Sequence, residues 1–305
     1  MIATVARQQF VALRRQQIFL AVLAILLAMT SLAGFLGWMS HHTVVQAYDE
    51  AVRILAAQGQ PAPPDPLGLK PPLSLLSNLA VYIPLIGALL AIVVGHLSLA
   101  DEQAEGIGRV IFTRPVSRTT FLFGKVVAVA AVLAAILAAS LVTSVASLVM
   151  VNGSVPSAAE LGRLGLFYGL SWLYLLLFAL IGMVTVLATR RRSLGLLAAL
   201  GVWMVLTFAV PQFTSGLRPT ASLNPVTDPV STSQPFFGAT AHARSFSVSE
   251  QYKQAAAQIL ETGTAEPWSD TGRRVLPLLG ALVGVGLLTG GLARRHDFST
   301  GPSGD

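Results

Sequence analysis

The sequence predicts an all-α membrane protein that crosses the bilayer six times, and three observations predict this class. Hydrophobic residues make up 53% of the 305 residues and charged residues only 11%, whereas a soluble domain carries roughly 25% charged residues. The mean hydropathy is +0.68. Six long stretches contain no Asp, Glu, Lys or Arg, and each is near the roughly 20 residues that a helix needs to cross the hydrocarbon core. A soluble protein is excluded because it could not cover its surface with so few charges, and a disordered chain because its hydrophobicity would be low.

Buried helices of a large soluble protein are the alternative to membrane spans, but such helices seldom run this long without one charge. The first span follows Arg14 and Arg15 as a signal peptide would. Its apolar run of about 22 residues exceeds the 7–15 of a cleaved signal core, so we expect an uncleaved anchor. The predicted spans are 18–39, 79–100, 126–152, 164–189, 194–215 and 275–293.

The basic residues predict the orientation of the spans. One set of connections holds 12 of the 20 Lys and Arg residues, although it is much shorter than the other set. The positive-inside rule therefore places this set, and both termini, in the cytoplasm. Arg273 and Arg274 lie next to the sixth span on the other side, against the rule. The predicted cytoplasmic segments are 1–17, 101–125, 190–193 and the tail 294–305. Since topology accounts for the net charge of +6, we predict no nucleic-acid partner.

The segment 1–17 has an amphipathic pattern. An apolar stripe of period 3–4 suits a helix lying in the cytoplasmic membrane interface. A plain extension of the first span fits the pattern equally well. The stripe consists of Ile2, Ala6, Phe10 and Leu13.

Two long connections, 40–78 and 216–274, lie on the predicted outer side. The first opens with a helical stripe and continues as a proline-rich stretch, 61–72, which we expect to be extended. In the second, Ser247 and Glu250 have the spacing of a capping box, which predicts the start of a helix. These connections predict a small extracytoplasmic cap or docking surface, with loosely ordered connectors as the alternative. The stripe of the first connection is Val45, Tyr48, Val52 and Leu55.

Prolines and glycines inside the spans predict local departures from straight, evenly spaced helices. Pro84 and Pro211 should kink or locally open the second and fifth spans. The sixth span contains two small-xxx-small motifs, which favour a close approach of helices but do not define a dimer face. These motifs are Gly280/Gly284 and Gly286/Gly290.

Motifs for catalysis or metal binding are missing from the sequence. Its lack of cysteine removes thiolate sites. Of His, Asp, Glu, Lys and Arg, the predicted spans contain only His96, which we interpret as an interfacial residue. His41 and His42 are adjacent, which is the wrong spacing for a metal site on one helical face. Gly124-Lys125 lacks the rest of a phosphate-binding loop. We therefore predict that the chain is not an enzyme, holds no metal or cofactor, and draws any energy from another polypeptide.

The segment 101–125 is the most informative connection. It is too long for a tight turn, and apolar residues 110–112 separate an acidic start from a basic end. Pro115 interrupts it, and Ser117 can cap a second helix that runs into the third span. This pattern predicts an element that docks into a partner. The charges are Asp101, Glu102 and Glu105, then Arg109, Arg114, Arg118 and Lys125.

This segment resembles the first coupling element of ABC-2 type transporter permeases. The likeness lies in an acidic-glycine step, an apolar stretch, a Pro-Val-Ser-Arg turn and a Gly-Lys pair entering the third span. In this sequence these are Glu105-Gly106, 110–112, 115–118 and Gly124-Lys125. The six-span layout, the basic loop between spans four and five and the amphipathic amino-terminal segment are also similar. Leu223-Asn224-Pro225 resembles permeases of the nitrous-oxide-reductase maturation type.

The resemblance implies an ABC-2 (type V exporter-like) transmembrane domain, paired with a second permease copy or a paralogue. ATP and Mg would then be bound by a separate ATP-binding cassette ATPase subunit. The residues that the resemblance places against that subunit are Glu102, Glu105, Gly106, Arg109 and Arg118, with Arg190, Arg191 and Arg192 as a second contact.

The function predicted first is the permease subunit of an exporter in the cell membrane. Its largely apolar spans suit a lipid-like or amphipathic cargo, and membrane lipid is an expected partner. The alternative is a mechanotransmission or scaffold subunit that acts on an extracytoplasmic protein through the outer connections. Substrate-binding residues are not predicted by the sequence.

Overall fold

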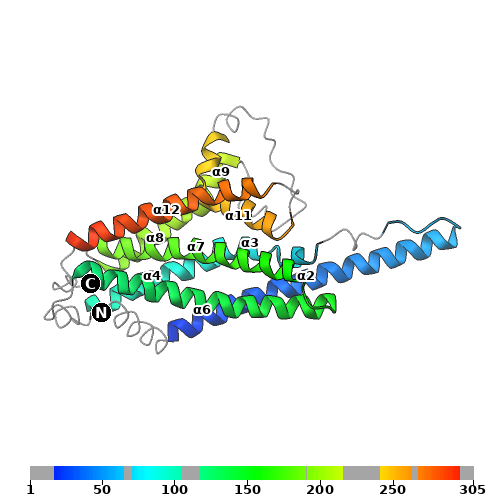
Figure 1. Cartoon of the computed structure of the whole chain (residues 1–305), viewed down its shortest axis with the longest axis horizontal. Coiled ribbons are helices and arrows are strands. Elements are labelled where there is room, and N and C mark those ends of the chain that lie inside the picture. The colour runs from blue at the N-terminus through cyan, green and yellow to red at the C-terminus, as the bar shows by residue number, and fades with distance from the viewer. Residues whose placement is uncertain are drawn as a thin grey trace.

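The computed structural model describes residues 17–64, 71–104, 117–189, 191–215, 241–262 and 267–295 (Figure 1). Within these ranges every regular element is helical, and six helical stretches are long and apolar enough to cross a membrane. The predicted all-α, six-span class is therefore confirmed. The predicted interface helix 1–17 lies almost wholly outside the described residues, as do the tail from 296 on and the Leu223-Asn224-Pro225 motif.

Four of the six stretches are continuous helices, and the second and fifth contain short irregular turns. The continuous helices are α2 (Gln17–Ala57), α6 (Arg118–Asn152), α7 (Ala158–Ala188) and α12 (Trp268–Arg295). The second stretch comprises η1 (Pro72–Leu76), α3 (Leu79–Tyr82), η2 (Ile83–Gly87) and α4 (Ala88–Ala104). The fifth comprises α8 (Arg192–Met204), η3 (Val205–Ala209) and α9 (Val210–Ser215). Between the fifth and sixth lie η5 (Ala241–Phe246) and α11 (Val248–Ile259).

The helices alternate in direction, so alternate connections lie at the same end of the bundle. The two ends differ in composition. At one end, on the left in Figure 1, α2, α6 and α8 begin while α4, α7 and α12 end. We call it the basic end because Arg118, Arg191, Arg294 and Arg295 lie there. The opposite end carries α11 and the projecting part of α2. The segments grouped together by their positive charge thus connect helices at one end of the bundle.

Helix α7 forms the centre of the bundle and packs against α4, α6, α8, α11 and α12. Two glycines allow α4 to approach it at backbone distance. A Cβ on Gly95 would lie 2.0 Å from the Ala179 carbonyl oxygen, and one on Gly182 would lie 2.4 Å from the Ile92 carbonyl oxygen. Only glycine fits at such a contact, because backbone atoms cannot move aside as a flexible side chain can.

The glycine motifs of the sixth span do not mediate packing within the described chain. A Cβ added at Gly280, Gly284, Gly286 or Gly290 would meet no described atom within 4 Å. The expected close approach therefore occurs between α4 and α7 instead of at α12. The single sequence gave no means to separate glycines that face a neighbouring helix from those that face outward.

Helix α2 continues beyond the predicted end of the first span at residue 39. Its 41 residues span about 60 Å at roughly 1.5 Å per residue, which is about twice the hydrocarbon core. The stripe predicted for the first outer connection therefore belongs to the same helix, and this part projects from the bundle (Figure 1). Gly59, at a φ of 70°, ends the helical path. The chain then folds back, and the Tyr48 hydroxyl donates to the Pro63 carbonyl at 3.1 Å.

The predicted effect of the two prolines is confirmed. Pro84 lies in the π-helical turn η2, and its carbonyl accepts a hydrogen bond from the Trp203 indole N–H at 3.1 Å. Pro211 is the second residue of α9, two positions after the end of the π-helical turn η3. In each case the missing N–H and the ring of proline are accommodated by a locally widened turn. A third proline, Pro277, lies inside α12.

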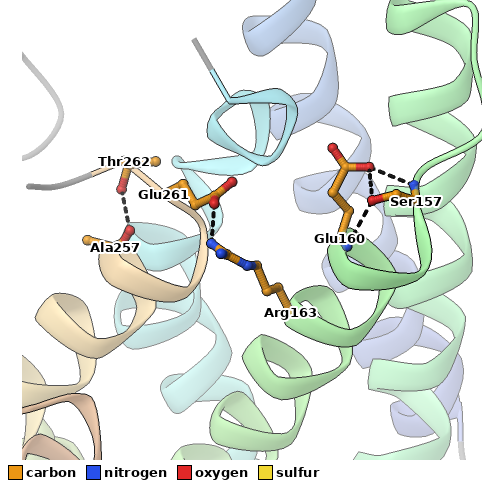
Figure 2. A network of polar contacts seen from close by, with 6 residues as sticks. All are labelled: Ser157, Glu160, Arg163, Ala257, Glu261 and Thr262. Atoms are coloured by element: carbon orange, nitrogen blue, oxygen red, sulfur yellow. Dashed lines mark hydrogen bonds and ion pairs between the residues drawn. The ribbon is translucent and has the colours of Figure 1, made fainter. Parts of the chain in front are cut away.

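One predicted cap forms, one does not, and a third was missed. Ser117 caps α6, because its hydroxyl accepts a hydrogen bond from the Thr120 N–H at 3.1 Å. Ser247 does precede α11, but its side chain makes no capping hydrogen bond. Figure 2 shows a full capping box at α7 instead, where Ser157 and Glu160 bond to each other's backbone N–H groups. Glu250 is unavailable for the predicted box because it is turned toward other elements, as described below.

Candidate functional site

The basic end contains a lysine that the sequence analysis placed at the end of the connection 101–125, in the Gly-Lys pair entering the third span. Lys125 lies in the second turn of α6 and is only 1% exposed. Its Nζ donates to the Ser98 carbonyl of α4 at 3.0 Å and lies 5.4 Å from the centre of the Phe121 ring. The signal that could have located it is helical spacing: Phe121, Lys125 and Val129 recur every four residues on one buried face.

Lys125 joins the two helices that flank the predicted docking segment. Helix α4 leads into 101–125 and α6 leads out of it, so the bond from Lys125 to Ser98 closes the base of this connection. An ammonium group bonded to a carbonyl in a water-poor place makes a charge-assisted hydrogen bond, which is stronger than one between neutral groups. We infer that α4 and α6 respond as a unit to a force applied between them.

His96 is buried where the sequence analysis expected an interfacial side chain. It belongs to α4, is 4% exposed, and its ring approaches Gly195 near the start of α8. Gly195 in turn packs against Thr189, whose hydroxyl donates to the Thr185 carbonyl at 2.6 Å. This cluster joins α4, α7 and α8 beneath the short basic loop.

The structure describes only some of the predicted contact residues. Arg118 is exposed in the first turn of α6, and Arg191 is exposed at the N-cap position of α8. Glu102 lies in the last turn of α4 and Arg192 begins α8, but their side chains lie outside the described part. Glu105, Gly106, Arg109 and Arg190 fall outside the described residues, so the predicted contact set stays a prediction.

At the other end, helix α11 enters the bundle through a layer of polar contacts. The Tyr252 hydroxyl lies 2.8 Å from the Ser171 hydroxyl, and the Tyr174 hydroxyl lies 2.8 Å from that of Ser249. The two tyrosine rings are 4.5 Å apart. Tyr252 is 1% exposed, and this burial raises its pKa well above the usual range. The connection 216–274 thus supplies a packed element of the bundle through α11, and loosely ordered connectors do not describe this helix.

A buried carboxylate fixes the start of α11. Glu250 is 5% exposed. It forms an ion pair with Arg244 at 2.5 Å and accepts a hydrogen bond from the Thr214 hydroxyl at 3.1 Å. These contacts join α11 to η5 and to the end of α9. Burial also lowers the pKa of the neighbouring Lys253, an effect that Glu250 partly opposes.

The far end of α11 is joined to α7 by a second ion pair. Figure 2 shows Arg163 of α7 paired with Glu261, which follows α11. The Arg163 guanidinium also lies 5.5 Å from the centre of the Trp268 ring at the start of α12. Both ends of α11 are therefore fastened to the spans.

The described polar contacts hold helices together. Within the described ranges, no group of three or more His, Asp or Glu side chains could hold a metal. His42, which the sequence analysis considered as a ligand, stacks on Trp38 and lies 3.1 Å from the Gln46 amide nitrogen. The geometry offers a bundle with a charged end, a lysine that joins two helices at that end, and the packed helix α11 at the opposite end.

These features define a polytopic helical bundle with six helices long and apolar enough to cross a membrane. A family model described as ABC-2 family transporter protein matches residues 3–289. The chain therefore belongs to the ABC-2 transporter family, and its place in the cell membrane follows from that membership and from the six apolar helices. Its role as a transport subunit that works with an ATP-binding partner follows from the same match. No curated protein matches the chain at a significant level.

Proposed function

We propose that this chain is the permease of an exporter and that its separate ATPase docks on the connection 101–125. The observation that carries the proposal is the Lys125–Ser98 bond, which joins the two helices on either side of that connection. Because α4 packs at backbone distance on α7 through Gly95 and Gly182, a push on the connection would reach the centre of the bundle. Such a direct path from a docking element to the spans is what ATP-driven movement requires.

The predicted contact residues fit this proposal as a set. Glu102 and Glu105 offer carboxylates, and Arg109, Arg118 and Arg190–Arg192 offer guanidinium groups that can make paired hydrogen bonds to a partner's acids. ATP and Mg would be held by the ATPase. We further propose that a second copy or a paralogue of this permease completes the transporter, and that the cargo is lipid-like or amphipathic, as the apolar spans suggest.

Docking of a cytoplasmic ATPase at 101–125 requires the basic end to face the cytoplasm. The chain has no cysteine, so single cysteines can report on topology. We expect Gln60→Cys to react with an impermeant thiol reagent in intact cells, and Val110→Cys to react only after the membrane is permeabilised. The reverse pattern would overturn the orientation and, with it, the docking proposal.

The proposed function is tested by asking which polypeptide hydrolyses ATP. The chain lacks a phosphate-binding loop, so the purified chain in vesicles is expected to hydrolyse no ATP above background. Addition of its ATPase should produce hydrolysis that the cargo stimulates. ATP hydrolysis by the isolated chain would contradict the proposal, and mutation of the ATPase's own phosphate loop serves as the control.

One observation favours a second candidate function, mechanotransmission to an extracytoplasmic partner. Helix α2 extends well beyond the bundle (Figure 1), and its projecting part carries exposed charges such as the Glu50–Arg53 pair. A long continuous helix can convey movement of the spans to a protein outside the membrane. Under this candidate, internal deletion of residues 41–57, which removes the projecting part of α2, should abolish the action on that partner while leaving ATP hydrolysis by the complex intact.

A further inference from the structure

A groove lies between α6 and α12 at the basic end, with α7 as its floor. Its volume is about 460 Å³, within the roughly 300–1,000 Å³ of ordinary ligand sites. The buried side of the groove is formed by Leu180 of α7 and Leu122 of α6, each 5% exposed. Phe123 and Val126 form the α6 wall, while Gly286 and Gly290 form the α12 wall.

The two glycines keep the groove open. They are four residues apart and so lie on one face of α12, and a Cβ on either would meet no described atom within 4 Å. The space above them is therefore not filled by any described part of the chain. A larger side chain at position 290 would project into the groove.

The mouth of the groove at the basic end is polar and positively charged. Arg294 lines it, together with Thr119 and Thr120 of the first turn of α6. No acidic side chain of the described segments forms an ion pair with Arg294. A guanidinium can bind an anion by two parallel hydrogen bonds, and the threonine hydroxyls can add further ones. An apolar groove within a membrane-spanning bundle, with an arginine at its mouth, matches a molecule that has a hydrocarbon chain and an anionic head.

We propose that this groove binds one anionic phospholipid from the leaflet at the basic end. The phosphate lies against Arg294 and the threonine hydroxyls, and an acyl chain occupies the space over Gly286 and Gly290. An arginine can hold a phosphate by two parallel hydrogen bonds, and basic pockets between spans favour anionic headgroups. The proposal concerns a bound lipid of the resting subunit and does not depend on the exporter function.

The chain supplies closely matched variants and controls. Arg294→Gln removes the charge at the mouth, while Arg295→Gln removes the next charge on the same helix end, which does not line the groove. Gly290→Leu fills the groove, while Gly291→Leu adds the same side chain one residue away, where the space is also open. Melting temperatures measured without anionic lipid check that each variant is folded.

The test is retention of phosphatidylglycerol by the full chain in detergent, counted by native mass spectrometry during a titration, with phosphatidylcholine as the neutral probe. We expect one tightly retained phosphatidylglycerol per chain and weaker retention of phosphatidylcholine. Arg294→Gln should weaken retention about fivefold, the effect of one basic residue near an anionic lipid, and Gly290→Leu should abolish it. Arg295→Gln and Gly291→Leu should retain the lipid.

Three results would overturn the proposal. Equal retention of the two lipids would show that the mouth does not select a charge. Equal losses from Arg294→Gln and Arg295→Gln would mean that the helix end attracts lipid without a defined site. Disulfide cross-linking between two copies through Gly290→Cys would mean that another permease covers the groove. Because Arg294→Gln lies at an exposed helix end, the test remains decisive even if Gly290→Leu fails to fold.

Discussion

Gly182→Ala is expected to destabilise the protein severely, although alanine is the better helix former. The added Cβ would lie 2.4 Å from the Ile92 carbonyl oxygen and 3.0 Å from the His96 backbone nitrogen. Both atoms belong to the backbone of α4, so α4 and α7 would have to separate. Overpacking of this kind costs about 3 kcal/mol, which exceeds the gain of about 1 kcal/mol from helix propensity.

The measurement is the melting temperature of the purified chain in one detergent. Gly284→Ala is the matched control, because it makes the same change in a helix at a position with open space. We expect Gly182→Ala to melt well below the wild type and Gly284→Ala to melt at or slightly above it. If Gly182→Ala melts at the wild-type temperature, α4 and α7 do not approach as closely as described.

Lys125→Met is expected to uncouple the permease without unfolding it. Methionine has nearly the same length and packs well in apolar surroundings, and replacement of a buried charge by an apolar group is often neutral for stability. The variant loses the bond from Nζ to the Ser98 carbonyl, a contact worth about 1.5–3 kcal/mol. Hydrolysis of ATP by the assembled transporter should therefore fall by about tenfold or more.

Val127→Met provides the control for this prediction, since Val127 lies on the same turns of α6 but is 37% exposed. It should hydrolyse ATP at the wild-type rate. Melting temperatures and membrane yields of both variants should be close to those of the wild type. Wild-type hydrolysis by a folded Lys125→Met variant would show that the link between α4 and α6 does not transmit movement.

The six spans could be predicted because a membrane imposes a simple rule on the sequence. Runs without charge must be long enough to cross the hydrocarbon core, and the chain obeys this rule six times. The helix boundaries were less well predicted where a helix continues past the end of its apolar run. In α2 the apolar run ends near residue 39, but no strong helix breaker follows before Gly59, so the helix continues beyond the apolar run.

The contacts between helices could not be predicted in the same way. Lys125 and Glu250 were read as charges at the membrane edge or in a cap, yet both are buried by elements distant in sequence. The glycines of α12 fit a packing motif better than Gly95 and Gly182 do, yet the latter pair makes the close contact. A single sequence gives the period of a helix face but does not say which face meets another helix.

The most direct test of the predicted docking segment is the amount of ATPase that co-purifies with the chain. Tagged wild-type and variant chains would be purified from native membranes, and the associated ATP-binding cassette protein quantified. Glu105→Lys reverses a charge in the acidic-glycine step, and Arg118→Ala removes a group that can make a bidentate contact. Glu50→Lys makes the same reversal on the projecting part of α2, where Glu50 is exposed.

We predict that all variants insert at the wild-type level and that the wild type and Glu50→Lys recover the ATPase. Arg118→Ala and Glu105→Ala should recover less of it, and Glu105→Lys should recover least, because it sets like charges against each other. Full recovery of the ATPase by Glu105→Lys, Glu105→Ala and Arg118→Ala would contradict docking on the connection 101–125.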